Sequence, residues 1–149
     1  MGWPVRTSQG HIGEDPTFRV SFVKEATDYL AYIKALIVVN PQVLRFNVVR
    51  EEAQGDRGLL RYRLTLRGSL LEIFELFQIV EGMVQVTKYS FHWQDKTGKL
   101  LKRWDNAAHH RELSTSPHHV HDGKEENVRP HESVSAEEVL TLVTAEALE

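Results

Sequence analysis

The pattern of apolar residues has a helical period before Pro41. Apolar side chains recur at helical spacing after Asp28, which can serve as an N-cap, and the pattern stops at Asn40-Pro41. This predicts a helix over residues 28–39. Upstream, Phe18, Val20 and Phe22 alternate with polar residues and can instead form a short strand.

Beyond Pro41 the period changes to two, which is typical of β-strands. Leu44, Phe46 and Val48 alternate with polar or smaller residues, and residues 60–66 repeat the pattern with leucine and tyrosine. Glycine-containing turns separate these segments from further expected strands at residues 70–79, 83–94 and 99–105. Four or five strands joined by short turns predict an antiparallel meander with one apolar and one polar face.

A second helix is predicted near the C-terminal end, over residues 135–147. Ser135 and Glu138 have the spacing of a capping box, and an apolar stripe follows them. Because two helices can cover the apolar face of the meander, the predicted fold class is α+β. We expect a single domain over 1–149, with a loosely ordered leader at 1–16, the helix, sheet and histidine-rich loop at 17–131, and an acidic C-terminal helix at 132–149.

The composition excludes several classes of chemistry. With 41% apolar and 26% charged residues, the chain is typical of a globular domain. It has no cysteine, which excludes disulfides, thiolate catalysis and thiolate-bound zinc. The longest apolar run, residues 36–39, is too short to cross a bilayer, and no secretion signal is visible at the start, so we expect a cytoplasmic protein with no membrane partner.

The net charge of −3 is unevenly distributed. Residues 132–149 contain five acidic and no basic side chains, which leaves 18 basic and 16 acidic side chains in residues 1–131. The body of the protein is therefore mildly basic. This permits phosphate contacts at a local patch but lacks the strongly basic surface of a general DNA-binding protein.

Histidines are concentrated around the end of the predicted sheet. Residues 106–134 lack periodicity, and a loop of this length in a compact domain is usually functional or disordered. Histidine can accept or donate a proton near neutral pH, so two of these side chains can perform acid–base chemistry. Alternatively, single members can simply bind loop backbone. Six of the eight histidines fall within thirty residues: His92, His109, His110, His118, His119 and His121.

The same histidines permit a second interpretation, a metal site. His119 and His121 form an HxH pair, and His109, His110 or Asp105 can complete the ligand set. This spacing is weakly specific, so we assign no metal and no cofactor. The alternative to a catalytic function is a histidine-rich metal-binding module or a non-catalytic protein-interaction module.

The end of the last predicted strand carries charge. Alternation places Arg103 and Asp105 on one face and Trp104 on the other. Arg103 can bind a phosphate and Asp105 can orient a histidine, although the two can also form a surface ion pair with Trp104 in the core. Three arginines on an earlier strand can follow a nucleic-acid backbone, but such a stripe is often a solvated sheet face. They are Arg61, Arg63 and Arg67.

Four segments of the chain resemble the TumE family of small toxins in order and spacing. Ala108 departs from the proline expected before the histidine pair, which changes only the expected loop shape. The resemblance covers about residues 27–147. The segments are 68–75 (GSLLEIFE), 89–94 (YSFHWQ), 103–110 (RWDNAAHH) and 117–121 (PHHVH).

This resemblance implies the toxin of a bacterial or archaeal type II toxin–antitoxin pair, with a ribonuclease-like activity on RNA. It also implies a cognate antitoxin with a helix-turn-helix DNA-binding domain. By analogy of fold alone, a sheet preceded by a helix is similar to RelE-type and barnase-type ribonucleases. A homo-oligomer is not excluded.

Metal-free RNA cleavage needs a base, an acid and a cation near the phosphoryl group. We expect His92 and one histidine of the His118-His119 pair to be the acid and base, Arg103 to stabilise the phosphate, and Asp105 to orient an imidazole. The expected catalytic set is His92, Arg103, Asp105, His110, His118 and His119, and the expected RNA contacts are Arg61, Arg63, Trp104, Asn106 and His121.

Overall fold

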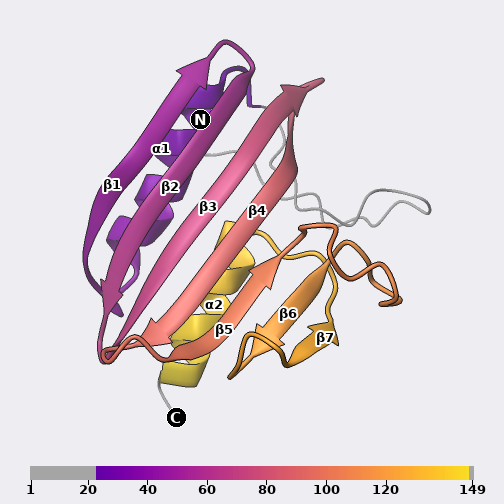
Figure 1. The fold of residues 1–149 in the computed structure, drawn as a ribbon. Coiled ribbons are helices and arrows are strands. Elements are labelled where there is room, and N and C mark those ends of the chain that lie inside the picture. The colour runs from indigo at the N-terminus through magenta and orange to yellow at the C-terminus, as the bar shows by residue number, and fades with distance from the viewer. Residues whose placement is uncertain (1–22, 148–149) are drawn as a thin grey trace.

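The computed structural model describes residues 23–147; the predicted leader and the alternating segment at residues 18–22 lie outside the described residues. Helix α1 precedes seven strands, and helix α2 follows them. Each strand pairs antiparallel with the next, so the order of strands in the sheet is their order in the chain (Figure 1). The elements are α1 (Ala26–Val39), β1 (Val43–Gln54), β2 (Arg57–Leu66), β3 (Ser69–Val80), β4 (Met83–Asp95), β5 (Leu100–Asp105), β6 (His119–Asp122), β7 (Val128–Pro130) and α2 (Ala136–Ala147).

Both helices lie against the same face of the sheet (Figure 1). Helix α1 begins earlier than predicted, because Glu25 is the N-cap and Asp28 accepts a 2.9 Å hydrogen bond from the Glu25 backbone N–H. The prediction of Asp28 as the N-cap was therefore wrong: it is the third helical residue of a capping box. The capping box predicted for α2 is confirmed, since Ser135 Oγ accepts a hydrogen bond from the Glu138 N–H at 3.1 Å and Glu138 Oε1 accepts one from the Ser135 N–H at 3.3 Å.

The core lies between the helices and the sheet. Alternate side chains of β2, β3 and β4 point toward the helices and are buried, whereas their neighbours point to the opposite, open face. Burial of each large apolar side chain contributes about 1.5–3 kcal/mol, so this layer fixes which face of every strand is polar. Its fully buried members include Tyr29, Ile33, Tyr62, Ile73, Phe91 and Val139.

The α+β meander is confirmed, but the predicted number of four to five strands was too small. Strands β6 and β7 arise within residues 106–134, where the sequence showed no periodicity. With four and three residues, these strands are too short to display an alternating pattern. Hydrogen bonding of β6 to the edge of β5, and of β7 to β6, makes them strands.

One carboxyl group is buried among the apolar side chains. Glu75 of β3 is fully buried, accepts a 2.6 Å hydrogen bond from the Tyr29 hydroxyl, and accepts a 3.2 Å hydrogen bond from the Ala136 N–H. It therefore joins β3 to α1 and to the first turn of α2. Burial raises the pKa of Glu75 to about 7, although both hydrogen bonds act to lower it.

The raised pKa of Glu75 predicts a pH dependence of stability. In the unfolded chain this carboxyl ionises near the ordinary glutamate value of about 4.3, so between that pH and about 7 the folded state holds the proton more tightly. The free energy of unfolding should therefore fall as the pH rises through this window, by up to roughly 1.4 kcal/mol per pH unit. Glu75→Gln, which cannot ionise, should show a flatter dependence in urea unfolding at pH 5 and pH 8. The exposed Glu126→Gln is the control, and equal slopes for the two variants would contradict the prediction.

Candidate functional site

The candidate site is built on the open face of three adjacent strands. In the register of the sheet, His92 of β4 pairs with Arg103 of β5, and Arg103 pairs in turn with His121 of β6. Asp105 pairs with His119 in the same way. Residues between them, such as Trp104, point into the core. The prediction that His92 and Arg103 lie on the polar face of neighbouring strands is therefore confirmed.

The carboxylate of Asp105 lies at the centre of this cluster. Its Oδ1 is 2.9 Å from His119 Nε2 and accepts a 3.0 Å hydrogen bond from the Ala107 N–H. Its Oδ2 accepts a 3.2 Å hydrogen bond from Arg103 Nε and lies 3.5 Å from His121 Nε2. The Asp105 side chain is only 9% exposed, so little water competes for these contacts. Asp105 thus holds a guanidinium and two imidazoles in fixed positions.

The hydrogen bonds assign the tautomers of the two β6 histidines. His119 Nδ1 is 2.9 Å from the Pro117 carbonyl oxygen, and His121 Nδ1 is 2.7 Å from the Glu125 carbonyl oxygen. A carbonyl can only accept, so both Nδ1 atoms carry hydrogen. The two Nε2 atoms therefore face the cluster and lie 3.2 Å apart. The His121 Nε2 lone pair accepts a 3.1 Å hydrogen bond from Arg103 Nη2.

The contact between His119 and Asp105 is placed for proton transfer. His119 Nδ1 donates to Pro117, so the ring nitrogen that faces the carboxylate is Nε2, 2.9 Å from Asp105 Oδ1. Both side chains are buried beside a cavity. Such an arrangement can deliver or accept a proton during a reaction.

Arg103 connects this cluster to the surface through Glu125. Its Nη1 donates to Glu125 Oε1, and the Glu125 side chain is 57% exposed. The hydrogen bond from Arg103 lowers the pKa of Glu125, and the charge of the guanidinium adds to the effect. Glu125 was not among the predicted site residues, because a glutamate in an aperiodic loop gives no sequence signal. An anion arriving from solvent would compete with this exposed carboxylate for Arg103.

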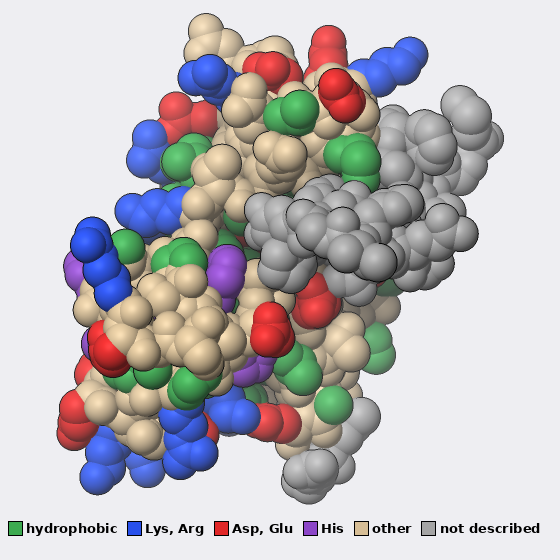
Figure 2. Space-filling model, turned by 90° about the vertical axis from the view of Figure 1, so that its right-hand side faces the viewer, with side chains coloured by type: hydrophobic (Ala, Val, Ile, Leu, Met, Phe, Trp, Pro, Cys, Tyr) green, Lys and Arg blue, Asp and Glu red, His purple; other side chains and the backbone are tan. Residues whose placement is uncertain are grey.

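The loop that follows β5 packs over the cluster. The ring of His110 packs edge-on to those of His119 and His121, with centroids 5.0 and 5.9 Å away, whereas His109 is exposed. A cavity of about 240 Å³ lies among β4, β5, β6 and this loop, lined in part by Ser90 and Arg103. Figure 2 shows one side of the molecule, on which histidine side chains appear only as small separate areas. His119 and His121 are buried and His110 is half-buried, so these three histidines form a partly enclosed site rather than an exposed patch.

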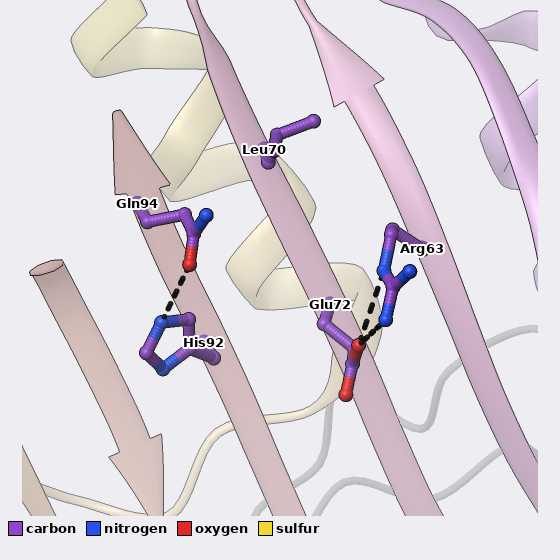
Figure 3. Close-up of a pocket in the computed structure, with 5 residues that line it drawn as sticks. All are labelled: Arg63, Leu70, Glu72, His92 and Gln94. Carbon is purple, nitrogen blue, oxygen red and sulfur yellow. Dashed lines mark hydrogen bonds and ion pairs between the residues drawn. The ribbon is translucent and has the colours of Figure 1, made fainter. Parts of the chain in front are cut away.

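His92 borders a second and wider depression on the same face. This groove of about 460 Å³ crosses β2, β3 and β4, and His92 Nε2 lies 3.1 Å from Gln94 Oε1 at its side (Figure 3). Across the groove, Arg63 donates a 3.0 Å hydrogen bond to Glu72. His92 is thus one strand away from Arg103 and two strands away from His121. The site consists of a histidine cavity and a groove, with Arg103 between His92 and His121.

Other predicted site residues lie elsewhere. His118 is on the opposite face from His119, where its Nδ1 is 2.8 Å from the Tyr89 hydroxyl and its ring stacks on Tyr89. Trp104 is 3% exposed in the core, with its ring edge-on to His131. Of the predicted acid–base pair His118-His119, only His119 therefore shares a face with His92.

The remaining predicted RNA contacts are engaged within the protein. Asn106 accepts a 3.0 Å hydrogen bond from the Tyr89 N–H and donates a 3.1 Å one to the Thr87 carbonyl, so it anchors the start of the loop. Arg61 and Arg63 both form ion pairs with Glu72, at 2.7 and 3.0 Å. These ion pairs neutralise part of the arginine charge on the open face.

Comparison with protein families identifies the chain. The family model described as Toxin TumE matches residues 31–149. The chain belongs to the TumE toxin family. The match includes the whole sheet and the site, and it confirms the resemblance carried by the four sequence segments. Comparison with curated proteins and with solved structures gave no match, so the likeness to RelE-type or barnase-type ribonucleases is not confirmed. Neither α1 nor α2, the helices of the described part of this toxin, has the length and apolar character needed to cross a membrane.

The central position of Asp105 predicts a large effect of its removal on stability. Asp105→Ala should lower the free energy of unfolding by about 2–4 kcal/mol, because Arg103 and two nearly buried imidazoles lose their shared partner. Urea unfolding of the purified variant measures the change. Glu126→Ala, at an exposed position, should stay within about 0.5 kcal/mol of the original protein. Equal stability of the two variants would mean that the Asp105 network does not support the fold.

Proposed function

We propose that this TumE-family toxin is an endoribonuclease that uses histidine acid–base catalysis and needs no metal ion. The observation that supports the proposal is the convergence of the His119–Asp105 pair, in contact at 2.9 Å, and Arg103 on one cavity. Together these groups offer proton transfer and positive charge, the two requirements of metal-free phosphodiester cleavage.

In the proposed reaction, a base removes the proton from a ribose 2′-OH, whose oxygen attacks the adjacent phosphorus. The bond from phosphorus to the 5′-oxygen breaks, and an acid protonates that oxygen, leaving a 2′,3′-cyclic phosphate and a free 5′-OH. His119, held by Asp105, serves as one proton carrier, and His92 serves as the other. His110 borders the cavity and supports the bound substrate there.

Arg103 binds the phosphate in this proposal. In the register it lies between His92 of β4 and His121 of β6, and neighbouring strands are about 4.8 Å apart. A phosphate at Arg103 would therefore have His92 on one side and the β6 histidines on the other. The phosphate would replace the carboxylate of Glu125 on the guanidinium. Negative charge that develops on the phosphoryl oxygens is then stabilised by a donor already fixed by Asp105.

The groove beside His92 provides a path for the rest of the RNA. Arg63 is 55% exposed and lies across this groove, with Arg61 beside it on the same strand. Phosphates following the groove would compete with Glu72 for these arginines. Trp104 and Asn106 have no part in this path, because the first is in the core and the second is bound to backbone.

A matched pair of adjacent histidines tests the assignment. His119→Asn should lower the rate of RNA cleavage by about 10²–10⁴-fold, the usual contribution of a positioned acid or base, and His92→Ala should do the same. His118→Asn should leave the rate within a few-fold, because His118 points to the opposite face. The measurement is cleavage of a labelled RNA by each purified variant, with the melting temperature recorded beside it. Loss of cleavage in the His118 variant with retention in the His119 variant would refute the assignment.

The toxin family also supports a protein partner. We propose a cognate antitoxin with a helix-turn-helix DNA-binding domain, which suppresses toxicity by covering or distorting the open face. Expression of the toxin alone should arrest growth with loss of intact RNA. Co-expression with the adjacent small DNA-binding gene should restore growth and yield a complex that co-purifies. Growth arrest with intact RNA would instead favour a non-catalytic interaction module.

A further inference from the structure

Three histidines direct ring nitrogens toward one point in the cavity. One ring nitrogen from each of His110, His119 and His121 lies within 4.8 Å of the other two. His119 and His121 are 2% and 6% exposed, so their rings are held by surrounding protein, and His110 approaches from the loop. Three imidazoles and the Asp105 carboxylate therefore meet at one side of the cavity, which is the kind of donor set that binds a metal ion.

The second feature is the way in which two of these rings are oriented. The Nδ1 atoms of His119 and His121 both donate to backbone carbonyls, which leaves both Nε2 atoms facing inward. This is the outer-shell support that metal-binding histidines usually have. The two Nε2 atoms are 3.2 Å apart. Ligands of a tetrahedral ion with bonds of about 2.0–2.1 Å lie about 3.3–3.4 Å apart, so the rings need almost no movement to share an ion.

We propose that His110, His119 and His121 bind a divalent transition metal ion of the zinc class, and that the bound ion switches off RNA cleavage. The fourth ligand is the carboxylate of Asp105, whose Oδ1 lies 2.9 Å from His119 Nε2. The binding site is independent of the reaction, whereas the inhibition rests on the proposed ribonuclease function.

The ligand chemistry selects the class of ion. Three neutral imidazoles and one carboxylate suit Zn²⁺, Co²⁺ or Ni²⁺. Mg²⁺ and Ca²⁺ prefer sites built mostly from oxygen, and Asp105 is the only carboxylate within 3 Å of these ring nitrogens among the described contacts. The chain has no cysteine, so thiolate ligands are excluded.

Inhibition follows from the atoms that the ion would occupy. The ion takes the Nε2 lone pair of His119, the atom that faces Asp105, so His119 can no longer accept or donate a proton at that atom. It also takes the Nε2 lone pair of His121, which accepts the hydrogen bond from Arg103 in the metal-free state. The ion and the guanidinium thus compete for one lone pair, and their like charges repel. The metal-bound and catalytically competent states exclude each other.

The test of binding titrates Zn²⁺ into the purified, metal-free full chain by calorimetry, with Co²⁺ absorption reporting the coordination geometry. We expect one ion per chain. His110→Asn and His121→Asn should each weaken binding by at least about 10–100-fold, more than the loss of an outer-shell partner. His109→Asn is the matched control and should leave the affinity unchanged, since His109 lines the same cavity but contributes no nitrogen to the group of three. Arg103→Gln should tighten binding, because it removes the competing cation.

The test of inhibition follows RNA cleavage in the same preparations. Cleavage should persist in EDTA, fall at least tenfold with one equivalent of Zn²⁺, and recover when EDTA is added. Absence of Zn²⁺ binding, or binding unchanged in both the His110 and His121 variants, would overturn the site. Cleavage that requires the ion would overturn the inhibition and the metal-independent mechanism together. If no condition gives cleavage, the proposed function and the inhibition both fail, while the titration still decides the metal site.

Discussion

The contact of a single carboxylate with three cationic or proton-bearing side chains determines the character of this site. Asp105 is nearly buried, and its two oxygens meet Arg103, His119 and His121 from two neighbouring strands. A buried carboxylate without partners would lower the stability of the folded state, so its contacts with Arg103, His119 and His121 are required and fix the positions of these side chains. The same carboxylate lies 2.9 Å from His119 Nε2, so an acidic group and an imidazole meet beside the cavity.

The two faces of the sheet have different roles. On the helix side, Glu75 is a buried carboxyl group, and it is satisfied by Tyr29 and by the first turn of α2. On the open side, charged groups are paired across strands, as Glu72 is with Arg61 and Arg63. The apolar side therefore supplies a rigid platform, and the side chains fixed by it on the open side form the groove and cavity of this TumE-family toxin.

Arg103 takes part in both proposed activities, RNA cleavage and its inhibition by a metal ion. Its guanidinium contacts Asp105, Glu125 and His121 at once, and each contact is one that a phosphate or a metal ion would alter. An incoming phosphate competes with the exposed Glu125, whereas an ion on the histidines competes with the guanidinium for His121. One arginine can thus belong to either of two mutually exclusive states of the same cavity, which is a simple physical basis for control by metal availability.

The sequence by itself determined the approximate extent of the helices and of the five longer strands, and the buried face of β2, β3 and β4, because the periods of 3.6 and 2 are local properties of the chain. In β1 the predicted apolar face is not buried, since register shifts interrupt the alternation and leave Leu44 and Val48 exposed. It also indicated that Arg103, Asp105 and the HxH pair belong to one candidate site. Only the tertiary structure decided the rest. Strand β6 exists through pairing with β5, and β7 through pairing with β6. The pairing of β6 placed His119 in the cluster and His118 on Tyr89. His110, and not His109, packs against the β6 histidines, and Glu125 contacts Arg103. Both contacts depend on how the loops pack on the sheet, and a loop has no repeating sequence pattern from which this packing can be predicted.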